Sequence, residues 1–259
     1  MTQVEPQFLY RYRHLQGEHR RWTSRILTHS VLHFAAPTSF NDPYDCKVHF
    51  RPRVSSADLR RKHVTLVKKY LPQLNRAQRR AKVAGDLKTV DPDEFLLKVS
   101  QGLQEAVEKL GVLSLSASDR NILLWSHYAA GHTGLCLKFL ATADTPFFGR
   151  AQPVQYSVAY PEVELLRDSP DRHIDAFLLT KAIDWKYEEE WRIIDHDSGP
   201  GEKVFPEGLL VGVILGARMP TEDKEVVVKW LGARKDPVQI YQASVSRASF
   251  GLEINPYEP

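Results

Sequence analysis

Hydrophobic and polar positions alternate early in the chain in a way typical of a strand, a helix and a second strand. In FLYRYR (residues 8–13), the aromatic residues fall on one face of a strand, and Leu9, Arg11 and Arg13 fall on the other. Residues 18–29 have the apolar spacing of a helix, and residues 31–37 return to a strand pattern. The turn-rich FNDPYD (residues 40–45) follows.

Residues 55–110 read as helical throughout. A first helix has the apolar stripe Leu59, Leu66, Val67 and Tyr70, a second begins at Asn75, and a third begins at residues 91–94 and ends before Gly111. We interpret residues 52–111 as a helical insertion or cap on a core domain.

The rest of the chain mixes strands and helices irregularly. Strands are predicted near residues 112–118, 133–140, 154–160, 186–193, 209–215 and 238–243, and helices near 121–131 (capped by Asp119), 172–182 and 221–231. This order favours one α+β domain over residues 1–259 with a mixed or antiparallel central sheet, rather than a doubly wound parallel sheet.

Charge is concentrated in the helical segment. The net charge of the 259 residues is +3, but residues 51–90 contain twelve Lys and Arg against Asp58 and Asp86, a balance of +10. Two interpretations stay open: a solvated helical face, or a surface for an anionic partner such as nucleic acid or the acidic remainder of the chain. The nucleic-acid-binding candidates are Arg60, Arg61, Lys68, Lys69, Arg79 and Arg80.

Several classes of protein are disfavoured. No apolar run has the length of a membrane span, and the N-terminus lacks the pattern of a signal peptide, so we expect a cytoplasmic protein without a membrane partner. Two cysteines exclude a disulfide framework, and the histidine spacings do not predict a metal site. The sequence does not indicate an oligomeric state.

The segment KYEEEWRI (residues 186–193) offers the strongest chemical pattern. Read as a strand, it places Glu188 and Glu190 on one face, with Lys186 and Arg192 one repeat outside them. Two such carboxylates would repel by roughly 2.5 kcal/mol at an effective dielectric of about 20, enough to tune a base. The alternative is a self-compensated salt ladder.

Three polar strand faces follow one another in the order Arg, Ser, Glu. Arg11 or Arg13 can bind a phosphate or pyrophosphate, Ser114 and Ser116 can fix a ribose, and a glutamate can stabilise positive charge at an anomeric carbon. The remaining candidates are catalytic His127 and Tyr128 in WSHY, and cofactor-binding Asn41 and Asp42 in FNDPYD.

The chain resembles a widespread bacterial family of unknown function. The resemblance rests on LYRYR, FNDPYD, LSLSASDRNILLWSHYAAGHTGLC, KAIDWKYEEEWRI and VGVILGAR, which together span most of the chain outside the basic segment. It implies a component of a phage-defence or toxin-like locus.

The chain is also similar to ADP-ribosyltransferases of the Arg-Ser-Glu type, in Arg11 or Arg13, Ser114 and Ser116, and Glu188 and Glu190. This similarity implies a split, ADP-ribosyltransferase-like sheet and an enzyme that consumes NAD by ADP-ribosyl transfer or hydrolysis. In that reading Glu190 stabilises the cationic ribose and Glu188 activates the acceptor. The alternatives are a non-catalytic nucleic-acid-binding module, and nuclease or glycosidase chemistry at Asp42, Asp45, Glu188 and Glu190.

Overall fold

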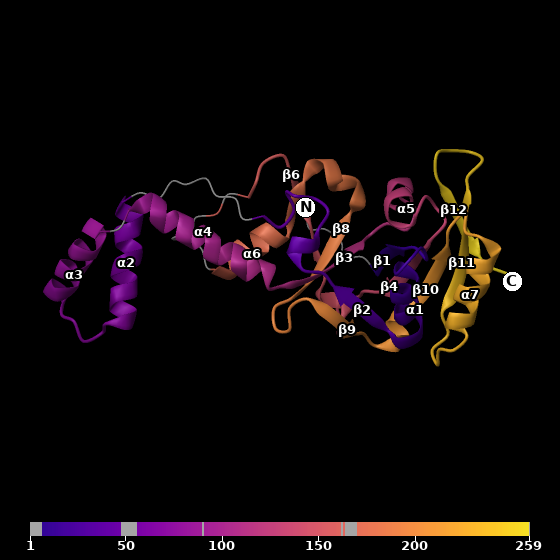
Figure 1. Ribbon diagram of the computed structural model, residues 1–259, viewed down its shortest axis with the longest axis horizontal. Helices are drawn as coiled ribbons and strands as arrows, with labels where there is room; N and C mark the ends of the chain where they lie inside the picture. The colour runs from indigo at the N-terminus through magenta and orange to yellow at the C-terminus, as the bar shows by residue number, and fades with distance from the viewer. Residues whose placement is uncertain (1–6, 48–55, 90, 162, 164–169, 259) are drawn as a thin grey trace. The chain divides into compact units, whose positions relative to one another are not determined.

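The structure is a computed structural model that describes residues 7–47, 56–89, 91–161, 163 and 170–258 (Figure 1). Its α-helices are α1 (His19–His29), α2 (Ser56–Tyr70), α3 (Arg76–Thr89), α4 (Pro92–Glu108), α5 (Ile122–Tyr128), α6 (Pro170–Leu178) and α7 (Thr221–Leu231). Its 3₁₀ turns are η1 (Pro37–Ser39), η2 (Phe148–Arg150), η3 (Ile183–Glu188) and η4 (Glu207–Leu209). No described helix is both long enough and apolar enough to cross a bilayer.

The strands are β1 (Phe8–Arg13), β2 (Val31–Phe34), β3 (Gly111–Ser116), β4 (Leu135–Leu140), β5 (Gln152–Pro153), β6 (Gln155–Ser157), β7 (Thr180–Ala182), β8 (Glu190–Asp195), β9 (Gly201–Val204), β10 (Leu210–Leu215), β11 (Gln239–Val245) and β12 (Leu252–Pro256). Among the described residues, eight of them form one sheet in the order β12-β11-β10-β4-β1-β3-β8-β5. The pairing of β10 with β11 is parallel and the other pairings in this sheet are antiparallel. The predicted α+β fold with a mixed central sheet is confirmed.

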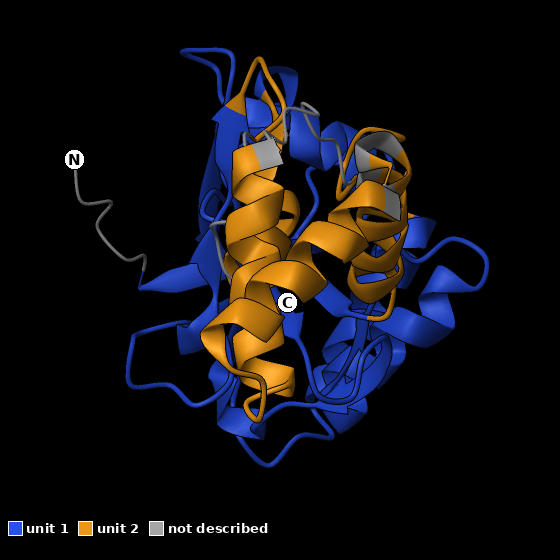
Figure 2. Cartoon of the chain, turned by 90° about the vertical axis from the view of Figure 1, so that its left-hand side faces the viewer, with its two compact units in different colours: residues 1–39, 110–156, 183–259 blue, residues 40–109, 157–182 orange. Residues whose placement is uncertain are grey.

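The chain forms two compact units (Figure 2). Unit 1 comprises residues 1–39, 110–156 and 183–259, and unit 2 comprises residues 40–109 and 157–182. Unit 2 therefore contains residues 52–109 of the segment interpreted as a helical insertion, and adds α6 and β7 from later in the chain.

Within unit 1, side chains pack on both faces of the eight-stranded sheet. On one face, α1, α7 and β2 contribute Leu27, Leu231 and Phe34 to a cluster that includes the strand residues Leu137 and Val213. We call this the α1 face. On the opposite face, Leu124 and Trp125 of α5 pack with strand residues that include Tyr12 and Cys136, and we call this the α5 face.

Helices α2, α3 and α4 of unit 2 follow the predicted pattern. Asn75 precedes α3, and its side chain accepts from the backbone N–H of Gln78 while the Gln78 side chain accepts from the backbone N–H of Asn75, each at 2.9 Å. This reciprocal arrangement satisfies two backbone donors at the start of the helix. The apolar stripe of α2 is only partly buried, because Leu66 and Tyr70 are exposed. Residues 51–55, which include the basic residues Arg51 and Arg53, lie outside the described residues.

Several predicted elements need correction. Residues 186–193 are not one strand, because η3 ends at Glu188 and β8 begins at Glu190. The helix predicted to run to residue 182 ends at Leu178, and β7 follows it. Asn121, and not Asp119, caps α5, with its side chain accepting from two backbone N–H groups. Strands β9 and β12 were not predicted.

Candidate functional site

The strands that carry the Arg, Ser and Glu motifs are neighbours in the sheet. Strand β3 lies between β1 and β8, with Tyr10 opposite Ser116 and Ser116 opposite Glu190. Residues that face each other across antiparallel strands project from the same side of a sheet. Tyr10, Ser116 and Glu190 therefore form one row across three strands on the α5 face.

The two arginines of β1 project from the other side. Arg11 pairs with Leu137, a residue of the α1-face cluster, whereas Tyr12 pairs with Cys136 of the α5-face cluster. Because side chains alternate along a strand, Arg11 and Arg13 both lie on the α1 face. Arg11 and Arg13 therefore do not share a face of the sheet with Ser116 and Glu190.

Glu188 and Glu190 are separated by a break in the backbone rather than related by strand alternation. Glu189 has a φ of 46°, in the left-handed region, between the 3₁₀ turn that ends at Glu188 and the strand that begins at Glu190. Such a conformation is uncommon for a residue with a side chain. Glu188 and Glu190 are both buried, whereas Glu189 is exposed. Neither Glu188 nor Glu190 therefore belongs to a solvated salt ladder.

Arg192 is the counterion of Glu190. Its Nε donates to Oε1 of Glu190 at 2.7 Å and its Nη2 donates to Oε2 at 3.0 Å. The Arg192 side chain has no solvent exposure. This bidentate pair holds the plane of the Glu190 carboxylate in one orientation.

Glu188 is tied to α5 and to β3. Oε1 of Glu188 accepts a hydrogen bond from the Tyr128 hydroxyl at 2.8 Å, and the carbonyl of Glu188 accepts one from Oγ of Ser116 at 2.7 Å. The amide of Asn121 donates to the carbonyl of Tyr187, one residue earlier. These bonds fix the turn that presents Glu188.

The charge state of Tyr128 follows from its surroundings. Burial raises the pKa of the Tyr128 phenol, and the neighbouring Glu188 raises that pKa further. Tyr128 therefore keeps its proton at neutral pH and acts as the donor to Glu188.

Four other predicted residues lie outside this hydrogen-bonded group. His127 is exposed on α5, with its ring centroid 6.4 Å from that of Tyr187. Asn41 and Asp42 belong to unit 2, where Asn41 is exposed and the Asp42 carboxylate accepts from the backbone N–H of Tyr44 at 2.8 Å. Ser114 is half-buried and pairs with Arg192 across β3 and β8.

The basic candidates lie on the two helices α2 and α3 of unit 2. Arg60, Lys68, Lys69 and Arg80 are exposed. Arg61 forms an ion pair with Asp58, and Arg79 donates to the carbonyl of Pro72 at 3.0 Å. Of the six candidates, Arg79 is partly buried and the other five are exposed.

Thiol and metal chemistry find little support in the described part of the chain. Cys136 is fully buried, and burial raises the pKa of its thiol, which opposes formation of a thiolate nucleophile. Across the described ranges, no group of three or more His, Cys, Asp or Glu side chains is placed to hold a metal ion.

Sequence reasoning missed Asn121, Tyr156 and the role of Arg192. The hydroxyl of Tyr156 accepts from the backbone N–H of Glu190 at 2.7 Å, at the point where β8 begins. Arg192 follows Glu190 by two residues on a strand, and this spacing alone predicts a shared face. Nothing local in the sequence indicates Tyr156, because its contact spans 34 residues.

A family model described as "Protein of unknown function (DUF2971)" matches residues 124–193. This stretch includes most of α5, all of β4 and the two glutamates with Arg192. No curated protein and no solved structure matches the chain.

Proposed function

We propose that unit 1 is a glycosyl-transfer enzyme that breaks the nicotinamide–ribose bond of NAD. The observation that carries the proposal is the coupling of Ser116 to both glutamates, through its hydrogen bond to the Glu188 carbonyl and its register opposite Glu190. The serine strand β3 lies beside β8, which begins at the buried Glu190 directly after the turn that ends at the buried Glu188, and this matches two of the three parts of the Arg-Ser-Glu pattern.

In this mechanism the two glutamates have different tasks. As the bond from the anomeric carbon to nicotinamide breaks, its electron pair leaves with nicotinamide, and the Glu190 carboxylate stabilises the positive charge on the ribose. Glu188 accepts the proton of the attacking hydroxyl, whose oxygen forms the new bond to that carbon. The attacking group is water in hydrolysis and an acceptor side chain or nucleotide in transfer.

The surrounding residues position these carboxylates. Arg192 orients Glu190, and Tyr128 orients Glu188. The guanidinium on the α5 face is thus Arg192, which shares that face with Glu190, rather than Arg11 or Arg13 of the α1 face.

The test is incubation of the protein with labelled NAD, alone and with DNA, RNA or protein. We expect nicotinamide release or label transfer, and a loss of about 100-fold or more in Glu188→Gln and Glu190→Gln. Glu189→Gln is the matched control, because this exposed residue lies between them, and it should keep full activity. No nicotinamide release, no transfer and no NAD binding by the wild type would exclude the proposal.

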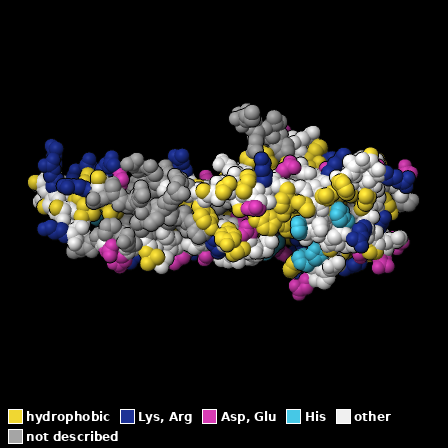
Figure 3. Space-filling view, turned by 90° about the horizontal axis from the view of Figure 1, so that it is seen from above, with side chains coloured by type: hydrophobic (Ala, Val, Ile, Leu, Met, Phe, Trp, Pro, Cys, Tyr) yellow, Lys and Arg dark blue, Asp and Glu magenta, His cyan; other side chains and the backbone are white. Residues whose placement is uncertain are grey.

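A second candidate function, nucleic-acid binding, is favoured by the exposed cations of α2 and α3. Figure 3 shows Lys and Arg side chains gathered where these two helices lie. Each phosphate contact steepens the fall of log affinity with log salt by about 0.9 for duplex DNA. The combined change of Lys68, Lys69 and Arg80 to glutamate should therefore flatten the slope by about 3, whereas Arg21→Glu on α1 should leave it unchanged. Equal slopes in the wild type and the triple variant would contradict this function.

A further inference from the structure

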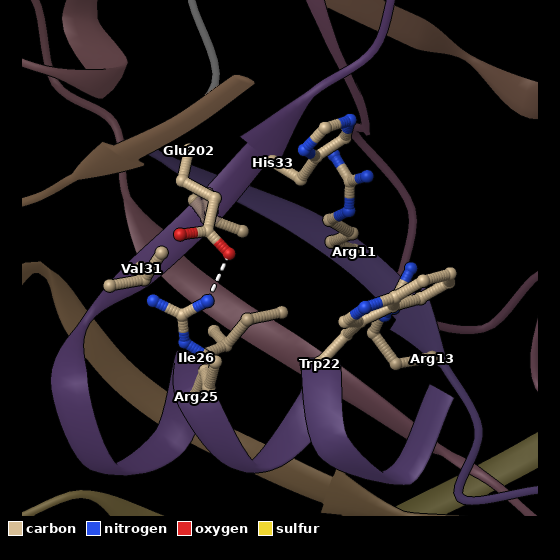
Figure 4. Close-up of a pocket in the computed structure, with 9 residues that line it drawn as sticks. Arg11, Arg13, Trp22, Arg25, Ile26, Val31, His33 and Glu202 are labelled. Atoms are coloured by element: carbon tan, nitrogen blue, oxygen red, sulfur yellow. Dashed lines mark hydrogen bonds and ion pairs between the residues drawn. The ribbon is translucent and has the colours of Figure 1, made fainter. Parts of the chain in front are cut away.

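Unit 1 contains a pocket on the α1 face of the sheet, opposite the face that carries Glu190. It has a volume of about 220 Å³ and is lined by Arg11, Arg13, Trp22, Arg25, Ile26, Val31, Leu32, His33 and Glu202 (Figure 4). These residues come from β1, α1, β2 and β9. Because Ser116 and Glu190 project from the opposite face of the sheet, this pocket is separate from the site proposed for NAD.

The pocket carries more positive than negative charge. Its lining has three arginines against one glutamate, a formal balance of +2 with His33 neutral. Glu202 forms an ion pair with Arg25, drawn as the dashed line in Figure 4, where Arg11 and Arg13 lie on the other side of the hollow. Glu202, the acidic residue in the lining, is therefore paired with Arg25 and not with Arg11 or Arg13.

Among the described residues neither β1 arginine has an acidic partner, and burial lowers the pKa of both guanidinium groups. One Nη of Arg11 donates to the carbonyl of Ser114 at 3.2 Å, which anchors the side chain without neutralising it. Nε of Arg13 is buried and has no hydrogen-bond partner among the residues that the structure describes. A buried donor without a partner costs free energy, and a ligand that accepts from it recovers that cost.

The remaining walls are apolar and aromatic. Ile26 and Leu32 are buried, and Trp22 on α1 is 46% exposed. Figure 4 shows the indole of Trp22 on the same side of the hollow as Arg13. An exposed indole beside a guanidinium suits a flat ring that carries an anionic group.

We propose that this pocket binds a small phosphomonoester with one flat ring, the chemistry of a pyrimidine mononucleotide. Arg11 and Arg13 hold the phosphate, since the guanidinium fork matches phosphate oxygens. The ring lies against Trp22 and the aliphatic wall. The volume lies below the range of about 300–1,000 Å³ typical of drug-sized ligands, so one ring and one phosphate suit it better than a dinucleotide.

Calorimetric titration of the full chain with uridine monophosphate, uridine and inorganic phosphate tests the proposal. Uridine monophosphate should bind more tightly than either fragment. Arg13→Gln should weaken its binding at least about tenfold. Arg21→Gln, an exposed arginine on the same helix as Trp22, is the matched control and should bind like the wild type. Trp22→Ala should weaken the mononucleotide while leaving inorganic phosphate unchanged.

Two further measurements keep the result interpretable. Chemical-shift changes of the Trp22 indole N–H on adding uridine monophosphate need only the wild-type fold, so they decide the case if Arg13→Gln does not fold. Glu190→Gln, once circular dichroism shows that it is folded, should bind the mononucleotide normally, which separates this pocket from the NAD site. No binding of uridine monophosphate at millimolar concentration, or equal affinity in the wild type and folded Arg13→Gln, would overturn the proposal.

Discussion

Arg192 holds Glu190 by two hydrogen bonds, of 2.7 and 3.0 Å, inside unit 1, with 0% of the Arg192 side chain and 5% of the Glu190 side chain exposed. The two residues are two positions apart on β8 and share its α5 face. The pair changes the interpretation of the acidic segment, because Arg192 is a buried partner of one carboxylate rather than a solvated cation beside both.

Breaking this pair should destabilise the fold. Arg192→Met leaves Glu190 as a buried charge without this counterion, and we expect a loss of about 3–5 kcal/mol in the free energy of unfolding, measured by urea denaturation. The double variant Glu190→Leu with Arg192→Met should recover much of the loss, since it removes both charges. Arg120→Met, at an exposed position, should stay within about 0.5 kcal/mol of the wild type. A cost below about 1 kcal/mol for Arg192→Met would be incompatible with the pair described here.

Removing the Tyr128 hydroxyl should affect both stability and catalysis. Tyr128→Phe deletes the donor to Glu188, which we expect to cost about 1–3 kcal/mol of unfolding free energy. If Glu188 is the proton acceptor, the same variant should lower the rate of nicotinamide release with little change in NAD affinity. Tyr44→Phe serves as the control, because Tyr44 is 64% exposed. An unchanged free energy of unfolding would show that the hydrogen bond to Glu188 makes no net contribution to stability.

Two glycines should respond to alanine in opposite directions. A Cβ at Gly134 would clash with the carbonyl oxygen of Arg13 and lie 3.0 Å from that of Ala129, so Gly134→Ala should destabilise the protein by about 1–3 kcal/mol. A Cβ at Gly102 within α4 meets nothing within 4 Å. Gly102→Ala should therefore stabilise the protein by about 0.5–1 kcal/mol, through helix propensity. Thermal denaturation of both variants checks the contrast, and equal shifts would refute the close approach at Gly134.

Stability should fall as the pH drops from 7.5 to 5.5. Desolvation lowers the pKa of His14 and of His19 in the folded protein, and the charge of Arg13 lowers both further. Unfolding lets these imidazoles take up protons near their ordinary pKa of about 6.5, so the unfolded state binds more protons in this range. His132 contributes in the same direction, through desolvation and Arg218.

Urea denaturation at several pH values measures this dependence. The variant His14→Gln with His19→Gln should lose less stability than the wild type between pH 7.5 and 5.5. His29→Gln is the control, because this histidine is exposed at the end of α1. If the stability of the double variant and of the wild type depended on pH identically, His14 and His19 would not be the source of the dependence.

The sequence determined the local elements where one physical signal dominates. The apolar spacing predicted α7 at residues 221–231, the bounds observed, and Asn75 marked the start of α3. These elements depend on contacts within a few residues, so periodicity and capping suffice to find them. The irregular order of strands and helices likewise predicted an α+β fold with a mixed or antiparallel sheet.

The tertiary structure decided how distant segments combine. The placement of β3 between β1 and β8 depends on pairings between residues far apart in the chain, and it puts Tyr10, rather than Arg11, in the row with Ser116 and Glu190. The left-handed conformation at Glu189 ended the strand that alternation predicted, and hydrogen bonds from Ser116 and Asn121, which are distant in sequence, hold that turn. A one-residue difference along a strand reverses the face of a side chain, so the motif determined which residues are present, and the register determined which of them meet.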